Sequence, residues 1–212
     1  ARFRSAGGRT LRIYNPVSAG NVPEKMDLAV LMAREPMVLA VGRLVPAKGF
    51  LNLLRAFARL EEPNARLVIL GSGPQREELL AEISRLGLEQ RVNLPGHMNE
   101  PWSFFKQARC LVSASHMESF GLVLVEAMAH GLPVVSTDCG ATAEVLESGR
   151  FGSLVPVGDE ARLTAAIQKA LSDPGDPAPR RAHATTFSTA AALDEYQRLI
   201  DRITEGTSPL PA

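Results

Sequence analysis

Six short and almost purely apolar runs recur along this chain, and they constrain its fold more than any other feature. They read MVLAVGR from Met37, ARLVILG from Ala65, RVNLPG from Arg91, CLVSAS from Cys110, PVVSTD from Pro133 and GSLVP from Gly152. Strands without polar alternation, each followed by a helix, are typical of a parallel sheet that is covered on both faces. The sequence therefore predicts a doubly wound, Rossmann-like α/β domain of about six parallel strands, with helices on both faces.

Segments with helical spacing separate these runs. We expect helices near residues 24–34, 48–60, 74–86, 102–108, 120–130, 141–147 and 160–171, and a last helix over 189–203. Pro74 suits the first turn of its helix, because proline lacks the amide hydrogen that a first turn leaves unpaired. Glu77 and Glu78 follow it, where the helix dipole favours acids.

The charge balance and the lengths of the apolar runs argue against two classes of function. Of the 212 residues, 45% are apolar and 22% are charged, and 23 Lys and Arg balance 23 Asp and Glu. Proteins that bind nucleic acid carry a clustered excess of cations, so nucleic acid is not an expected partner. No apolar run approaches the ~18 residues that a membrane-spanning helix needs, so we expect no transmembrane segment.

The cysteines and histidines give no sign of a metal or disulfide framework. Cys110 and Cys139 have no paired spacing, so we interpret them as free thiols, compatible with a reducing cytoplasm. His97 follows the run RVNLPG without a partner at metal-ligand spacing. The sequence therefore predicts no metal site.

Two glutamates mark the stretch ESFGLVLVEAMAHGLPVVSTD, residues 118–138. If Phe120 starts the helix, the amides of the next three residues are unpaired and face an anion. Glu118 and Glu126 would then lie ~12 Å apart along the helix axis. LVLVEAMA is apolar all round, so Glu126 should be partly buried and in need of hydrogen-bond donors. This arrangement suits a ligand with hydroxyls at both ends and an anion between them.

Two glycine-containing loops follow the first two apolar runs. In VGRLVPAKGF, Gly42 would allow a tight turn, and Arg43 and Lys48 would lie near the next helix start. Such a pair forms either an anion site or two surface cations, and the pattern alone leaves both open. LGSGP lacks the dinucleotide and P-loop patterns, so we favour a tight turn there, with Gly73 allowing a ligand to approach.

These motifs resemble, in order and spacing, the C-terminal donor-binding domain of the group 1 (family four) retaining glycosyltransferases. Enzymes of that family have two facing Rossmann-like domains. The resemblance is carried by NPV, VGRLVPAKGF, LVILGSGP, RVNLPG, the two-glutamate stretch and GSLVPVGD. One departure lies before Glu118, where the family often has Pro-Ser and this chain has Ala114 and Ser115, so the identity of the sugar stays open.

The resemblance implies roles for particular residues. Arg43 and Lys48, in the loop that begins at Gly42, would hold the diphosphate of a nucleotide sugar, and Glu118 would contact the transferred sugar. Glu126 would bind the ribose. The remaining donor-binding residues would be His97 and Met98 near the base, and the backbone of Phe120, Gly121, Leu122 and Val123 over sugar and phosphate. The resemblance also implies retention of configuration, UDP as the expected nucleotide, and no metal or other cofactor.

It further implies a division of the chain. Residues 1–17 would be a remnant of a linker or N-terminal domain, 18–175 the nucleotide-sugar-binding domain, and 176–212 helices that cross back to a missing N-terminal domain. That domain would bind a glycan or lipid-linked acceptor, so we expect this chain alone to be inactive. The whole enzyme is expected in the cytoplasm, peripheral at the inner membrane face.

Two other classes of function stay open at this point. One is a nucleotide-binding or interaction module without catalysis of its own. The other is a sugar-nucleotide epimerase or a phosphorylase of the same two-domain architecture, which no residue of this chain favours.

Overall fold

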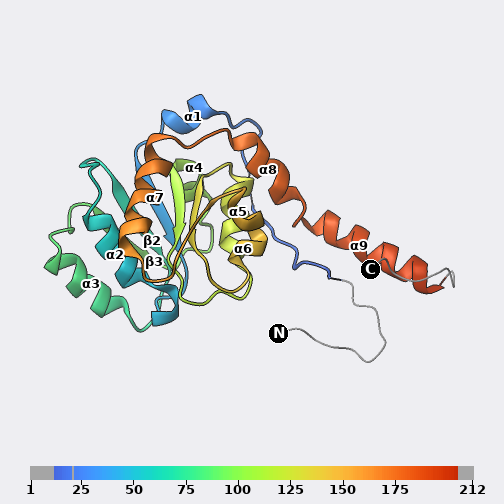
Figure 1. Cartoon of the computed structure of the whole chain (residues 1–212), viewed down its shortest axis with the longest axis horizontal. Helices are drawn as coiled ribbons and strands as arrows, with labels where there is room; N and C mark the ends of the chain where they lie inside the picture. Colours follow the sequence, from blue (N-terminus) through green and yellow to red (C-terminus); the bar gives the residue numbers. More distant parts are fainter. Residues whose placement is uncertain (1–11, 21, 205–212) are drawn as a thin grey trace.

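The computed structural model describes residues 12–20 and 22–204 (Figure 1). Residues 1–11, 21 and 205–212 lie outside the described residues. The expected N-terminal remnant and the end of the expected C-terminal segment therefore fall partly outside them. The boundaries drawn from the sequence at 17 and 175 stay predictions.

A single parallel sheet organises the described residues. Its six strands are β1 (Met37–Val41), β2 (Arg66–Leu70), β3 (Val92–Gly96), β4 (Cys110–Ser113), β5 (Val134–Thr137) and β6 (Ser153–Val155). Their order is β3-β2-β1-β4-β5-β6, and each neighbouring pair runs parallel. Every strand coincides with one of the apolar runs, so the predicted fold class is confirmed.

Helices cover both faces of the sheet, and further helices precede and follow the strands (Figure 1). They are α1 (Leu28–Met32), η1 (Pro46–Lys48), α2 (Phe50–Ala58), α3 (Arg76–Arg85), α4 (Trp102–Gln107), α5 (Leu122–Ala129), α6 (Thr142–Val145), η2 (Glu147–Gly149), α7 (Glu160–Ser172), α8 (Pro177–Thr185) and α9 (Thr189–Thr204). The helices expected between the strands are therefore present, several of them shorter than the sequence suggested.

Alternate residues of the strands feed two apolar layers. Val38 and Ala40 of β1 pack with α2, α3 and α7, whereas Leu39 between them packs with α4, α5 and α6. Successive side chains of a strand point to opposite faces, so a strand that is buried on both sides must be apolar throughout. The sheet is thus the middle layer of a three-layer domain.

Two helix starts differ from the sequence-based expectation. α5 begins at Leu122 and not at Phe120, because Gly121 adopts a left-handed conformation with φ 90° and serves as the N-cap. Glu118 therefore lies outside the helix, and the ~12 Å axial spacing of the two acids does not apply. Pro74 lies before the N-cap Gln75 of α3, so it is not in the first turn, whereas Glu77 and Glu78 are.

The last two helices, α8 and α9, differ in how they pack against the rest of the domain. α8 lies against α5, with Pro177 and Ala184 buried. α9 projects away from the sheet (Figure 1), and it leaves a row of large apolar side chains exposed. These are Leu193, Tyr196, Ile200 and Ile203. Within the described part of the chain, this face of α9 covers no apolar layer.

Candidate functional site

The strand order reverses between β1 and β4, and this reversal determines where a ligand can bind. From β1 the chain proceeds outwards through β2 to β3, then returns to pair β4 beside β1. In open sheets of this kind, ligands bind in the crevice outside the carboxyl ends of the strands beside such a reversal, here where the loops that leave β1 and β4 lie. The two loops at this edge are residues 42–49 and 114–121.

Gly49 brings these two loops into contact. It has φ 63° between η1 and α2, and a Cβ there would stand 1.9 Å from the carbonyl oxygen of Ala114. A glycine is needed for both reasons, the left-handed backbone and the close approach. The amide of His116 donates to the carbonyl of Ala47 at 2.8 Å across the same contact. The first loop is thereby held against the loop that carries Glu118.

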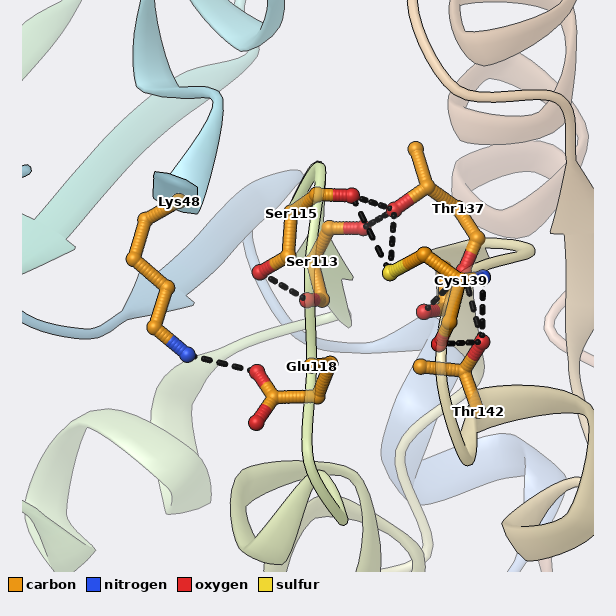
Figure 2. A network of polar contacts seen from close by, with 8 residues as sticks. Lys48, Ser113, Ser115, Glu118, Thr137, Cys139 and Thr142 are labelled. Carbon is orange, nitrogen blue, oxygen red and sulfur yellow. Dashed lines mark hydrogen bonds and ion pairs between the residues drawn. The ribbon is translucent and has the colours of Figure 1, made fainter. Parts of the chain in front are cut away.

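Lys48 and Glu118 form an ion pair at this contact. The Lys48 Nζ lies 2.5 Å from Glu118 Oε2, and the side chains are 27% and 11% exposed (Figure 2). A charge-assisted hydrogen bond between two partly buried side chains is stronger than an ion pair at the open surface. The structure thus brings together the predicted phosphate-binding lysine and the predicted sugar-binding acid.

A separate cavity of about 390 Å³ lies at the ends of β1, β2 and β3. Four predicted donor-binding residues line it, namely Gly42, Arg43, His97 and Met98, together with Ser72. Arg43 and His97 are exposed at its edge, and Met98 is half-buried. Apolar walls with a cation at the rim suit a base joined to a phosphate. Sequence reasoning did not point to Ser72.

Gly42 lines this cavity, and Gly73 lies in the LGSGP turn next to it. Gly42 was expected to allow a tight turn, but its φ is not positive, and a Cβ would only touch Lys48 and Phe50 at 3.5 Å. Gly73 was expected to let a ligand approach. A Cβ there would stand 2.4 Å from the carbonyl oxygen of Leu44, so Gly73 is needed for the packing of two loops, and the approach of a ligand stays a prediction.

The N-terminus of α5 follows the Glu118 loop directly. Gly121 is the N-cap, and the amide of Leu124 already donates to its carbonyl at 2.9 Å. Leu122 and Val123 then occupy the first helical positions, whose amides have no acceptor within the helix. Phe120 directs its ring away into an aromatic cluster with Tyr14 and Phe187, at centroid distances of 5.9 and 5.8 Å. The predicted anion-facing backbone therefore starts one residue later than expected.

Glu126 lies in the second turn of α5 and is half-buried. Burial raises the pKa of its carboxyl from 4.5 to about 7, because the charged form loses contact with water. Among the described residues, no hydrogen bond or ion pair to this side chain is found. A half-buried acid without a protein donor is the state expected of a group that accepts hydrogen bonds from a ligand.

A buried polar network supports the Glu118 loop from the side opposite Lys48 (Figure 2). Thr137 at the end of β5 donates from its hydroxyl to the carbonyl of Ser115 at 2.5 Å. Cys139 and Thr142 continue the network along the β5–α6 loop. Sequence analysis did not single out these threonines, although hydroxyl side chains at the end of a buried strand are a usable signal.

A larger cavity of the described chain lies elsewhere. It measures about 560 Å³ between residues 17–20 and 22–26, α5 and α8, and it is lined mainly by small and apolar side chains. Its charged lining residue is Arg181, whose guanidinium already donates to the carbonyls of Pro23 and Glu24. A diphosphate needs unpaired cations or amides, so this cavity fits such a ligand less well than the crevice at β1 and β4.

Residues 12–20 and 22–204 contain neither a cluster of metal-binding side chains nor a membrane-spanning helix. No group of three or more His, Cys, Asp or Glu side chains there could hold a metal ion. None of the helices in those ranges is both long enough and apolar enough to cross a membrane. Cys110 and Cys139 are buried free thiols, and burial raises the pKa of Cys110 to about 12.

The fold is a doubly wound α/β domain, and its candidate site places an ion pair and the start of a helix at the carboxyl ends of β1 and β4. Comparison with known families agrees with this class, since the family model described as "Glycosyl transferases group 1" matches residues 25–188. The chain belongs to this family of glycosyltransferases.

Individual relatives are named as glycosyltransferases too. The chain is 36% identical over 162 residues to a Campylobacter jejuni N-acetylgalactosamine-N,N'-diacetylbacillosaminyl-diphospho-undecaprenol 4-alpha-N-acetylgalactosaminyltransferase, an alignment that covers 76% of this chain and 44% of the relative. It is 33% identical over 173 residues to the lipopolysaccharide core biosynthesis glycosyltransferase LpsE of Rhizobium meliloti, with 79% and 50% covered. The chain thus spans about half the length of these curated relatives.

Among solved structures, Anabaena HepE in complex with UDP and glucose superposes with a TM-score of 0.79. The identity is 27%, and the superposition covers 92% of this chain and 59% of HepE. The likeness therefore extends over most of the chain.

Proposed function

We propose that this chain is the donor-binding half of a glycosyltransferase. In this proposal the enzyme moves a hexose or an N-acetylhexosamine from a UDP-sugar to a glycan or lipid-linked acceptor, with retention of configuration. The family membership supports sugar transfer. UDP is favoured by the HepE structure, which contains UDP, and a lipid-linked or lipopolysaccharide acceptor by the names of two relatives.

One observation carries the proposal: the crevice beside β1 and β4 combines Lys48 and Glu118 in contact, Arg43 at the rim of a neighbouring cavity, and the start of α5. A nucleotide-diphosphate sugar needs an anion site flanked by acceptors for hydroxyls on either side. Cations and helix amides serve the diphosphate, and carboxylates serve the hydroxyls.

The proposed roles of these residues follow from the charges that develop during sugar transfer. As the bond between sugar and diphosphate breaks, negative charge grows on the leaving diphosphate and positive charge on the sugar ring. Arg43, Lys48 and the amides of Leu122 and Val123 would stabilise the leaving group without a metal. Glu118, already paired with Lys48, would accept hydrogen bonds from sugar hydroxyls while the lysine turns to the phosphate.

The acceptor side lies outside this crevice in the proposal. The chain spans about half of its curated relatives, and the family has a second Rossmann-like domain facing the first. We expect nucleotide binding by this chain and no sugar transfer, because a donor crevice with one wall leaves the acceptor unpositioned.

A second candidate is an interaction module without catalysis of its own. The exposed apolar row on α9 favours it, because such rows mark contacts with other proteins. The intact set of Arg43, Lys48, Glu118 and Glu126 favours the enzyme, since an interaction module has no use for it.

Calorimetric titration of UDP and of GDP into the purified chain tests the proposal. We expect saturable binding of UDP, weaker binding of GDP, and unchanged affinity in the presence of EDTA. Glu126→Ala should weaken UDP binding by about 1–3 kcal/mol, the scale of a lost charged hydrogen bond. Glu61→Ala, at an exposed acid outside the site, is the matched control. A folded chain that binds neither nucleotide contradicts the proposal.

A further inference from the structure

The loop that carries Glu118 is held in place by side chains of a different loop, the one that follows β5. Glu118 lies in the irregular segment between β4 and α5, where no ladder fixes the backbone. A carboxylate on such a segment reaches a defined position only if the backbone beneath it is anchored. The anchors are therefore part of the site.

Thr137 provides the first anchor. Its hydroxyl donates to the carbonyl of Ser115 at 2.5 Å, and the thiol of Cys139 reaches the same carbonyl at 3.2 Å. Thr137 and Ser115 are each 2% exposed, so water does not compete for this hydrogen bond. Leaving a buried carbonyl without its donor is unfavourable, so this hydrogen bond determines the position of Ser115.

The second anchor holds Glu118 itself. The amide of Ala141 donates to the carbonyl of Glu118 at 3.3 Å. Gly140 has φ 57°, and a Cβ there would stand 1.8 Å from that same carbonyl oxygen. The backbone of Glu118 is thus pressed against the β5–α6 loop at a place that admits only glycine.

Thr142 fixes the anchoring loop in turn. Its hydroxyl accepts from the amide of Cys139 at 3.0 Å and lies 2.8 Å from the carbonyl of Thr137, to which it can donate. The side chain is fully buried. The network therefore runs without interruption from α6 through the end of β5 to the loop of Glu118 (Figure 2).

We propose that Thr137 is a positioning residue for Glu118, and that its hydroxyl fixes the carboxylate beside Lys48 for contact with the donor sugar. This inference rests on the proposed function, because it requires Glu118 to contact the sugar. It adds that the sugar end of the site is built by the β5–α6 loop as well as by the loop after β4. The cavity at the ends of β1, β2 and β3, which would take the base, is lined by none of these anchoring residues.

The test compares the affinities of UDP, UDP-glucose and UDP-N-acetylglucosamine by calorimetry. In the native chain, at least one sugar should add to the affinity of UDP, and Glu118→Gln should remove that addition. Thr137→Val, of similar shape but without a hydroxyl, should lower the ratio of UDP-sugar to UDP affinity at least fivefold. UDP affinity itself should change less than twofold.

Two controls isolate the hydroxyl. Thr137→Ser keeps it and should restore the ratio. Thr164→Val removes a half-buried hydroxyl that bonds to the carbonyls of Ala56 and Glu160, away from the site, and should leave the ratio unchanged. If Thr137→Val does not fold, Cys139→Ala takes its place, and the loss of the weaker donor to Ser115 should lower the ratio two- to threefold.

The possible outcomes separate the two proposals. A native chain that binds no UDP contradicts the proposed function, and this inference with it. A native chain in which neither sugar adds affinity contradicts the sugar contact of Glu118 and overturns the inference alone. An unchanged ratio in Thr137→Val, or an equal loss for UDP and UDP-sugar, would mean that Thr137 only supports the fold.

Discussion

At the scale of single residues, the site keeps an acid in a place that is unfavourable for its charge. Glu126 is half-buried on α5 and its pKa is raised to about 7 by burial. Such a group weakens the fold whenever it is ionised, and only a ligand that donates hydrogen bonds relieves this cost. The burial of Glu126 therefore lowers stability, and the proposed ribose contact would give this position a function.

Glu126→Gln should make the chain more stable at pH 8 and leave stability unchanged at pH 4. The folded-state pKa lies above the unfolded value of 4.5, so the stabilising contribution is complete below about pH 4.5 and is lost as the pH rises towards 7. Glutamine is not subject to this loss, and we expect a gain of about 1–2 kcal/mol at pH 8, since partial exposure reduces the full linkage.

Urea unfolding of both chains at pH 4, 6 and 8 measures this difference. The advantage of Glu126→Gln should grow between pH 4 and 8. Glu61→Gln, at an exposed position, should show no such growth. An advantage that is equal at every pH would contradict the burial argument.

Gly49 is the residue that joins the two loops of the site, and Gly49→Ala should separate them. The substitution places a Cβ 1.9 Å from the carbonyl oxygen of Ala114 in a backbone with φ 63°. We expect a loss of more than about 2 kcal/mol, of which about 1 kcal/mol is strain of the left-handed backbone.

Gly87→Ala is the matched control. Gly87 has φ 67°, but a Cβ there meets nothing within 4 Å, so only the strain remains. Thermal or urea unfolding of the two variants gives the cost of the close approach as their difference. Equal destabilisation would show that the loops yield without cost.

At the scale of elements, α8 and α9 contribute unequally to the domain. Phe187, at the junction between them, is buried and packs with Tyr14 and Phe120. Leu193 and Ile200 of α9 are exposed. The apolar face of α9 therefore adds nothing to the stability of the described domain, in contrast to the junction.

Substitutions at the junction and on α9 should therefore have different effects on stability. Phe187→Ala should destabilise the chain by about 3–5 kcal/mol, the usual cost of truncating a buried phenylalanine. Leu193→Gln combined with Ile200→Gln should change stability by less than about 0.5 kcal/mol. Calorimetric melting of the two variants gives the comparison, and a large loss from the α9 pair would mean that α9 packs onto this domain in solution.

At the scale of the whole molecule, the chain has a formal net charge of zero. A long-range field therefore contributes little to the attraction of an anion, and any salt dependence of nucleotide binding must come from cations at the site. Arg43 and Lys48 are the cations that the fold places there.

The double variant Arg43→Ala, Lys48→Ala should bind UDP more weakly and with a smaller salt dependence than the native chain. Titration at about 50 and 500 mM salt measures this dependence, since added salt screens exposed charges. Arg66→Ala is the control, because this exposed cation starts β2 at the opposite edge of the sheet. A salt response that persists in the double variant would place the phosphates elsewhere.

The sequence by itself determined the fold class and the edge of the sheet at which the candidate site residues lie. Strands that are buried on both faces must be apolar throughout, so each of the six strands was visible as a continuous run. Loops at the carboxyl ends of parallel strands share one edge, so the order of runs and loops along the chain was enough to assign Arg43, Lys48, Glu118 and His97 to that edge.

Only the tertiary structure decided how these residues meet. The left-handed Gly121 moved the start of α5, and the approach of Gly49 to Ala114 produced the contact between Lys48 and Glu118. The hydrogen bond from Thr137 to Ser115 joins residues that lie 22 positions apart in the chain. Such contacts depend on backbone conformation and close approach between distant segments, and the pattern of residue types along one chain does not contain them.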